Sequence, residues 1–156
     1  MTTTPERILV VDDEPGVRSV LEGILRDEGY QVATAASGEE GLEALEASSF
    51  DAVLLDVWLP GKDGLETLLQ LRERRIDAEV VMISGHGTID TAVRATKLGA
   101  FDFIEKPLSL EKTLLVLRNA LTQRRLMRRN WRLLEQLSRD TEILGESPAA
   151  QTLRAR

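Results

Sequence analysis

Two aspartates follow an unbroken apolar run near the start of the chain. Residues 8–11 read Ile-Leu-Val-Val, a run too short for a buried helix and rich in β-branched side chains, which favours a strand covered on both faces. Asp12 and Asp13 come directly after it, and the run at residues 52–55 ends in the same way at Asp56. If the two strands are neighbours, three carboxylates converge. Because like charges repel, such a cluster requires a cation, and ligands that are all oxygen suit Mg²⁺.

The rest of the chain supplies the elements that would bring these carboxylates together. Apolar strand-like segments alternate with helical patterns, which predicts an α/β fold with a parallel sheet covered on both faces. We expect five strands, at residues 8–11, 30–34, 51–56, 80–83 and 101–105. The first, third and fourth are unbroken apolar runs, whereas the second and fifth alternate, as edge strands do. This predicts a doubly wound sheet in the flavodoxin-like order 2-1-3-4-5, with the aspartates at its switch point.

Helix signals separate the strands. The first helix places a row of apolar residues on one face: Val17, Val20, Leu21, Ile24 and Leu25. Ser37 and Glu40 form a capping box before the second helix. The fourth helix, over residues 89–98, has a thin apolar face made of Ile89, Ala92 and Val93, which suggests a part that moves.

Composition excludes several classes of protein. The chain has 156 residues, 42% of them apolar, which is enough for one ordinary domain with an appendage. It contains no cysteine, so neither a disulfide framework nor a thiolate metal site is possible, which fits a reducing cytoplasm. No apolar stretch approaches about 18 residues, and residues 1–5 lack the features of a signal peptide. We therefore expect a cytoplasmic protein without a membrane segment.

Charge is unevenly distributed along the chain. Residues 1–117 hold 22 acidic and 11 basic side chains, a net charge of −11. Residues 118–139 hold seven arginines and one glutamate, a net charge of +6. The acidic part is a poor binder of nucleic acid. The basic part reads as a separate element.

Four motifs in a fixed order resemble the receiver domain of two-component response regulators. They are VVDDE, LLDVWLPGKDG, VMISGHG and GAFDFIEKP, and together they extend over about residues 7–121. The resemblance implies that Asp56 accepts a phosphoryl group from a sensor histidine kinase. It also implies Mg²⁺ held by Asp13, Asp56 and the Trp58 carbonyl, with Asp12 acting through water. The simpler alternative for Asp12 and Asp13 is that they complement the dipole of the following helix.

The resemblance also assigns a switch. It implies that Ser84 turns towards the phosphoryl group, that Phe103 is the aromatic switch position, and that Lys106 pairs with a phosphoryl oxygen. The bond between Lys106 and Pro107 is expected to be cis. The simpler alternatives are that Ser84 only forms a turn, that Phe103 only packs on an edge strand, and that Lys106 is an ordinary exposed lysine. His86 reads as a loop residue near the mouth of the site.

The last helix does not stop at the end of this domain. No glycine or proline occurs between Pro107 and Gly145, and apolar residues continue beyond residue 121. We expect residues 122–142 to form a linker helix that pairs with a second copy, through Leu126, Met127, Trp131, Leu134 and Leu137. Alternatively, the helix folds back on its own domain. Its arginines could bind nucleic acid, but such a run is more often a solvated helix face, so no direct nucleic-acid binding is expected.

The end of the chain and two of the motifs narrow the resemblance further. The segment 143–156 resembles the opening of the AAA+ ATPase domain of sigma-54-dependent activators of the NtrC type, and SGHGTIDTAV and LGAFDFIEKPL are typical of that group. This implies a receiver and linker whose ATPase and DNA-binding output domains lie beyond the present sequence. No P-loop motif occurs. The second hypothesis is a Mg²⁺-dependent phosphohydrolase with an aspartyl-phosphate intermediate, which usually has Asp-x-Asp where this chain has Asp12-Asp13-Glu14.

Overall fold

The computed structural model describes residues 5–85 and 89–143, and for residues 130–132 and 134–143 only the backbone. Five strands alternate with five helices. The strands are β1 (Arg7–Val11), β2 (Gln31–Ala35), β3 (Ala52–Asp56), β4 (Glu79–Ser84) and β5 (Asp102–Glu105). The helices are α1 (Pro15–Asp27), α2 (Gly38–Ala47), α3 (Gly64–Glu73), α4 (Ile89–Lys97) and α5 (Leu110–Ile143). Three predictions lie outside the described residues: the character of residues 1–4, the position of His86, and the resemblance of residues 144–156 to an ATPase domain.

The sheet is parallel throughout and has the order β2-β1-β3-β4-β5, as the sequence predicts. The three central strands are buried along almost their whole length, whereas β2 and β5 are partly exposed. In the register, Val11 lies opposite Leu55 and Asp56 lies opposite Ile83. The carboxyl ends of β1, β3 and β4 therefore meet at one edge of the sheet.

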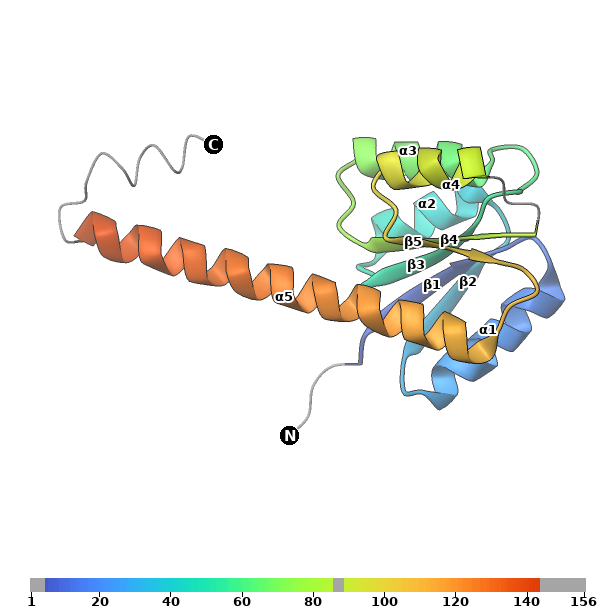
Figure 1. The fold of residues 1–156 in the computed structure, drawn as a ribbon, viewed down its shortest axis with the longest axis horizontal. Helices are drawn as coiled ribbons and strands as arrows, with labels where there is room; N and C mark the ends of the chain where they lie inside the picture. The colour runs from blue at the N-terminus through green and yellow to red at the C-terminus, as the bar shows by residue number, and fades with distance from the viewer. Residues whose placement is uncertain (1–4, 86–88, 144–156) are drawn as a thin grey trace. The chain divides into compact units, whose positions relative to one another are not determined.

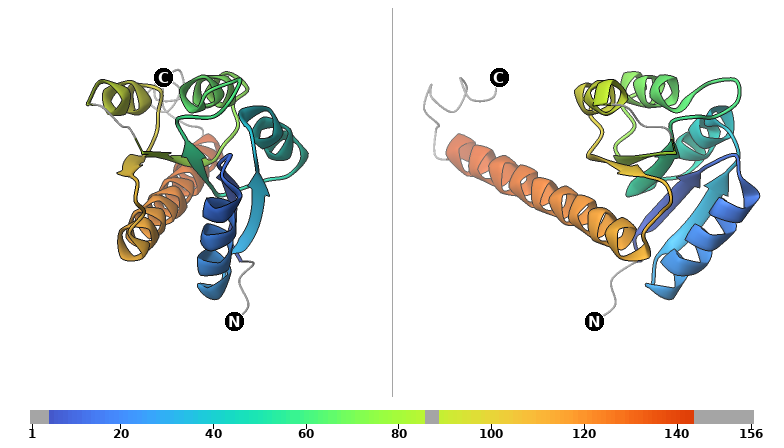
Figure 2. Two further views of the ribbon diagram at one scale, coloured as in Figure 1. Left: turned by 90° about the vertical axis from the view of Figure 1, so that its right-hand side faces the viewer. Right: turned by 45° about the vertical axis from the view of Figure 1, so that its right-hand side comes forward.

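Helices cover both faces of the sheet (Figures 1 and 2). One face packs against α2, α3 and α4, which contribute Leu42, Leu45, Leu68, Leu71 and Ala95 to the core. The other face packs against α1 and the first part of α5, which contribute Leu21, Leu25, Leu117 and Leu121. Because β1, β3 and β4 are buried between these two layers, their interior residues are all apolar, and polar side chains occur only at strand ends, as at Arg7, Asp56 and Ser84.

Two helices bury less than the sequence predicts. In α1, Leu21 and Leu25 are buried, but Val20 is 61% exposed, because it lies on the rim of an open groove between α1 and residues 107–113. In α4, Ala95 is buried, while Ile89 is 86% exposed and Val93 is also exposed. The apolar residues that the sequence singled out in α4 therefore form little of the core, and one small alanine makes the contact.

The chain divides into two compact units, residues 1–121 and residues 122–156. The first unit contains the whole sheet and both layers of helices. The second contains the remaining turns of α5, in which Leu126, Met127 and Leu133 are exposed. None of the helices in the described part of the chain combines the length and apolar character that a membrane crossing requires.

Candidate phosphoryl-acceptor site

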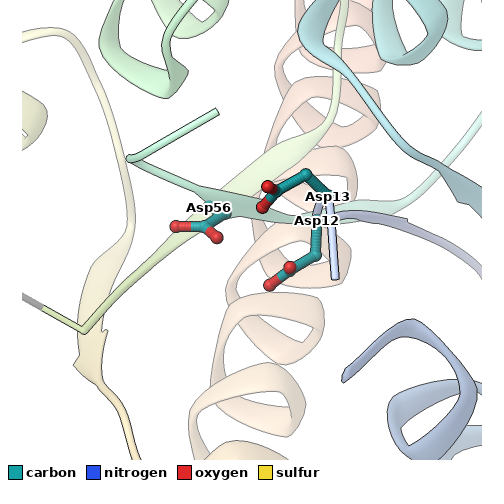
Figure 3. Close-up of side chains that lie close together, drawn as sticks. All are labelled: Asp12, Asp13 and Asp56. Carbon is teal, nitrogen blue, oxygen red and sulfur yellow. The ribbon is translucent and has the colours of Figure 1, made fainter. Parts of the chain in front are cut away.

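Three carboxylates lie together where β1 and β3 end (Figure 3). Asp12 and Asp13 follow β1 directly, and Asp56 is the last residue of β3. Each of the three can offer an oxygen atom within 4.8 Å of the others. Asp12 and Asp56 are only 1% and 3% exposed, whereas Asp13 is exposed. The convergence expected from two neighbouring strands is therefore present.

Lys106 is the cation nearest to these carboxylates. It follows β5, its N–H donates to the Ser84 carbonyl at 2.8 Å, and its bond to Pro107 is cis. Its Nζ lies 3.0 Å from Asp12 Oδ2 and 3.1 Å from Asp56 Oδ2. Glu14 Oε1 is 3.7 Å away. One ammonium group thus faces three carboxylates, which leaves the site with excess negative charge.

The pKa values of the central pair reflect this arrangement. Burial raises the pKa of Asp56 above its ordinary value, and the charge of Asp12 adds to that rise. The Lys106 hydrogen bond and the Trp58 N–H oppose it without cancelling it. Burial lowers the pKa of Lys106, but its close contacts with the carboxylates of Asp12 and Asp56 outweigh that effect, so its pKa is raised. Ionised Asp56 is therefore a costly group that a further cation would stabilise.

The loop after β3 is built closely around Asp56. The Trp58 N–H donates to Asp56 Oδ1 at 3.1 Å, and the Gly64 N–H donates to the Val57 carbonyl at 2.8 Å. Asp63 caps α3 by accepting from the Glu66 N–H at 2.8 Å. The Trp58 side chain is 55% exposed. These bonds fix where the Asp56 carboxylate points and where the loop backbone runs.

The two predicted switch residues lie on the neighbouring strands. Ser84 is the last residue of β4, directly after Ile83, which pairs with Asp56, and it is fully buried. Phe103 lies in β5 and packs, half-buried, against the core on the α2–α4 side. Ser84 therefore lies one strand away from Asp56, whereas Phe103 pairs with Met82 on β5, one strand further out.

The residues fit a divalent cation. Asp12 Oδ2 is buried and lies within ion-pair distance of Lys106, yet it has no hydrogen-bond donor in good geometry among the described residues. The donor set is made of carboxylate oxygens, which is the chemistry that Mg²⁺ prefers. A carboxylate cluster with spare acceptor capacity and excess negative charge satisfies what such a site requires.

Two side chains at the site were not predicted from the sequence. Glu14 reads as a solvated residue, and its side chain is 63% exposed, but its carboxylate also lies 3.7 Å from Lys106 Nζ. Arg18, on α1, donates from Nη1 to the Asp12 carbonyl at 2.7 Å. The position of Glu14 directly after the aspartate pair was a usable signal. Arg18 contacts a backbone atom, and a pattern of residue types in the sequence cannot predict such a contact.

Comparison with known proteins decides the family. The sequence profile of the response regulator receiver domain matches residues 8–118. The chain belongs to the response regulator receiver family. Within it, the chain is of the NtrX and NtrC type, and this receiver assignment does not favour the phosphohydrolase hypothesis.

Two curated relatives illustrate the likeness. The nitrogen assimilation regulatory protein NtrX of Azorhizobium caulinodans is 44% identical over 150 residues, which cover 95% of this chain and 33% of that protein. The DNA-binding transcriptional regulator NtrC of Escherichia coli K12 is 36% identical over 146 residues, covering 92% of this chain and 30% of that protein. The receiver chain thus spans about a third of the length of the curated relatives that it matches.

Solved structures show the same fold. The receiver domain of NtrX from Brucella abortus matches with a TM-score of 0.70 and 45% identity, covering 74% of this chain and 98% of that one. A beryllofluoride-activated NtrC4 receiver domain dimer matches with a TM-score of 0.72 and 42% identity, covering 76% and 98%. The receiver part of the present chain therefore corresponds to almost the whole of these isolated domains.

Proposed function

We propose that this receiver accepts a phosphoryl group on Asp56 from a sensor histidine kinase and thereby controls a sigma-54-dependent transcription activator. The observation that carries the proposal is the environment of Asp56. This buried carboxylate lies 3.1 Å from Lys106 and shares its volume with Asp12 and Asp13. Receiver family membership supports it.

The reaction follows from the groups present. An oxygen of Asp56 attacks phosphorus, and the bond between phosphorus and the donor breaks. The nitrogen of a phosphohistidine donor takes up a proton as it leaves, whereas acetate leaves acetyl phosphate as a stable anion without one. With a phosphohistidine donor the leaving group is imidazole, and with acetyl phosphate it is acetate. Lys106 is placed to pair with an oxygen of the transferred group, since it already contacts Asp56 Oδ2. Phosphoryl transfer needs mainly such positioning and charge neutralisation.

Mg²⁺ is the proposed cofactor. Asp13, Asp56 and the Trp58 carbonyl would hold it, with Asp12 acting through water. When bound, it would neutralise charge on the phosphoryl oxygens. The raised pKa of Asp56 supports this, because the carboxylate alone carries an unfavourable charge in the buried site.

Phosphorylation would then act as a switch. It adds about −1.5 to −2 charges and several acceptor oxygens beside Lys106 and Ser84. Ser84 would turn towards the phosphoryl group, and Phe103 on the adjoining strand would change its packing. The weakly packed α4, with a single buried residue among its described positions, is the element we expect to follow.

The output would lie outside the present sequence. The relatives named NtrX and NtrC are regulatory proteins about three times as long as the matched segment. By analogy, an ATPase domain and a DNA-binding domain would follow the linker and respond to the phosphorylation state of the receiver.

Stoichiometry distinguishes this function from hydrolysis. With Mg²⁺ and acetyl phosphate, the chain should incorporate about one phosphoryl group and then lose it slowly, because a regulator stores the modification. It should release no alcohol from a generic phosphate monoester. Continuous turnover of such an ester, measured by the released phenolate over many equivalents, would support a phosphohydrolase instead.

The linker is proposed to hold a homodimer. Leu126 and Leu133 are spaced seven residues apart, so they share one face of α5, and both are exposed, as is Met127. Leu133 was not among the predicted dimer residues, and the side chains of Trp131, Leu134 and Leu137 lie outside the described part. Each large side chain buried in a dimer would contribute roughly 1.5–3 kcal/mol. The full chain should therefore have the mass of a dimer by light scattering.

A double change tests where the dimer forms. Leu126→Glu with Leu133→Glu should give a monomer, because two charged pairs would replace apolar layers. Leu115→Glu is the control, since Leu115 is an exposed leucine of α5 within the first unit. If Leu115→Glu alone yields the monomer, the receiver surface forms the dimer and the linker does not.

A further inference from the structure

Arg18 contacts the backbone of the site and not its carboxylates. It lies one turn into α1, where its N–H donates to the Glu14 carbonyl at 3.1 Å. Its guanidinium reaches back over that turn, and Nη1 donates to the Asp12 carbonyl oxygen at 2.7 Å. The side chain is half-buried. A short hydrogen bond from a charged donor holds its acceptor firmly.

The acceptor is the peptide that joins the two acidic residues directly after β1, Asp12 and Asp13. The Asp12 carbonyl and the Asp13 N–H belong to one rigid plane, so fixing the carbonyl also fixes where Asp13 begins. Asp12 has other restraints: its N–H donates to the Ala35 carbonyl at 3.1 Å, and its Oδ1 accepts from the Glu14 N–H at 2.9 Å. The described residues give no hydrogen bond to the Asp13 carboxylate, so its direction depends on the backbone.

We infer that Arg18 is a positioning residue for the divalent-cation site, acting by orienting the Asp12–Asp13 peptide so that both carboxylates face the ion. This inference rests on the proposed Mg²⁺ site. Because Arg18 donates to a backbone carbonyl, this role requires no contact with the ion or the phosphoryl group. Its planar guanidinium suits the task because it holds a directed hydrogen bond that a flexible ammonium group holds less well.

Charge and position predict opposite signs for the effect of removing Arg18. A nearby positive charge repels Mg²⁺, so loss of the charge alone would tighten Mg²⁺ binding. Loss of positioning would weaken it, because removing a residue that orients metal ligands typically costs at least tenfold in affinity. The direction of the change in Kd therefore separates the two roles.

The test is calorimetric titration of the full chain with MgCl₂. Arg18→Met should raise the Kd about tenfold. Arg26→Met is the matched control: it removes the same charge from an exposed position at the other end of α1, where Arg26 pairs with Glu22. That variant should leave the Kd unchanged or slightly lower. Arg18→Lys, which keeps the charge and a donor, should fall between the wild type and Arg18→Met.

A readout without metal accompanies the titration. In the metal-free chain, Arg18→Met should speed hydrogen exchange at the Asp13 and Glu14 amides, and Arg26→Met should not. An unchanged or lowered Kd for Arg18→Met, or an equal rise for both variants, overturns the inference while leaving the proposed function intact. Absence of Mg²⁺ binding by the wild type contradicts both.

Discussion

Replacing Lys106 by methionine should destabilise the metal-free receiver by about 3 kcal/mol near neutral pH. Lys106 lies 3.0 and 3.1 Å from the carboxylates of Asp12 and Asp56, and those side chains are only 2% and 4% exposed. Methionine fills similar space but supplies no charge. Two buried carboxylates would then face each other with no cation between them, which costs more than the loss of a surface ion pair.

The loss of stability caused by Lys106→Met should be larger at neutral pH than at acidic pH. In the native chain burial raises the pKa of Asp56, and the Lys106 hydrogen bond limits that rise, so removal of Lys106 raises the pKa further. A carboxyl whose pKa is higher when folded binds its proton more tightly in the folded state, so ionisation reduces stability above that pKa. The destabilisation should be largest at neutral pH and shrink as pH falls towards 3.8, the ordinary value.

Urea unfolding in the presence of a chelator measures this. Lys106→Met and the wild type would be compared at about pH 7 and about pH 4, on either side of the expected transition. Lys112→Met is the control, since Lys112 is exposed on α5, and it should change stability by no more than about 0.5 kcal/mol. A loss of equal size at both pH values would show that Lys106 acts through packing and not through charge.

Gly64→Ala should cost about 3–4 kcal/mol and impair the site at the same time. A Cβ at Gly64 would overlap the Asp56 carbonyl oxygen and lie 2.7 Å from Val57 Cα, and both neighbours are backbone atoms. The side chain cannot rotate away from them, so α3 or the loop after β3 must shift. Because the Trp58 N–H in this loop donates to Asp56 Oδ1, the shift would also disturb the Asp56 carboxylate.

Gly23→Ala supplies the matched control. Gly23 is an exposed residue of α1, and an added Cβ there would meet nothing within 4 Å. Alanine is the better helix former, so this variant should gain up to about 1 kcal/mol. Denaturant midpoints of the two variants should therefore move in opposite directions. If Gly64→Ala unfolds at the wild-type midpoint, the close packing of α3 on the end of β3 is wrong.

The sheet could be read from the sequence because burial determines its pattern. Strands between two helical layers must be apolar at every position, and residues 8–11 and 80–83 are. Edge strands mix polar and apolar residues, as β5 does, with Asp102 and Glu105 exposed and Ile104 buried. Those two patterns show which strands lie at the centre of the sheet and which lie at its edges. With short connections between the strands, one simple strand order remains. The position of Asp56 beside Asp12 then follows from parallel strands ending at one edge.

The details that failed depend on surroundings that a single sequence does not contain. Val20 has the residue type and spacing of a core position, but its exposure depends on how far α1 lies from residues 107–113. Ala95 makes the buried contact of α4 because a small side chain allows close approach, and alanine carries no distinctive signal. Likewise Glu40 closes its capping box on the Ala36 N–H, one residue earlier than the usual partner.

The charged side chains of the site were easier to predict from the sequence than the residues that hold its backbone in place. Carboxylates and a lysine can be recognised in a sequence as groups that bind cations and phosphate. The structure does bring Asp12, Asp13, Asp56 and Lys106 together. Arg18 and Gly64 act on backbone atoms of the residues beside them, so their importance becomes visible only when distances are known.

The location of the phosphoryl group tests the account most directly. The wild type, Asp56→Asn and Asp63→Asn would each be incubated with acetyl phosphate and Mg²⁺ and weighed intact by mass spectrometry. Asp63 is the control because it is an exposed aspartate of the same loop that caps α3. The account predicts about one phosphoryl group on the wild type and on Asp63→Asn, none on Asp56→Asn, and none on any variant when a chelator replaces Mg²⁺. Equal labelling of Asp56→Asn and the wild type would contradict it.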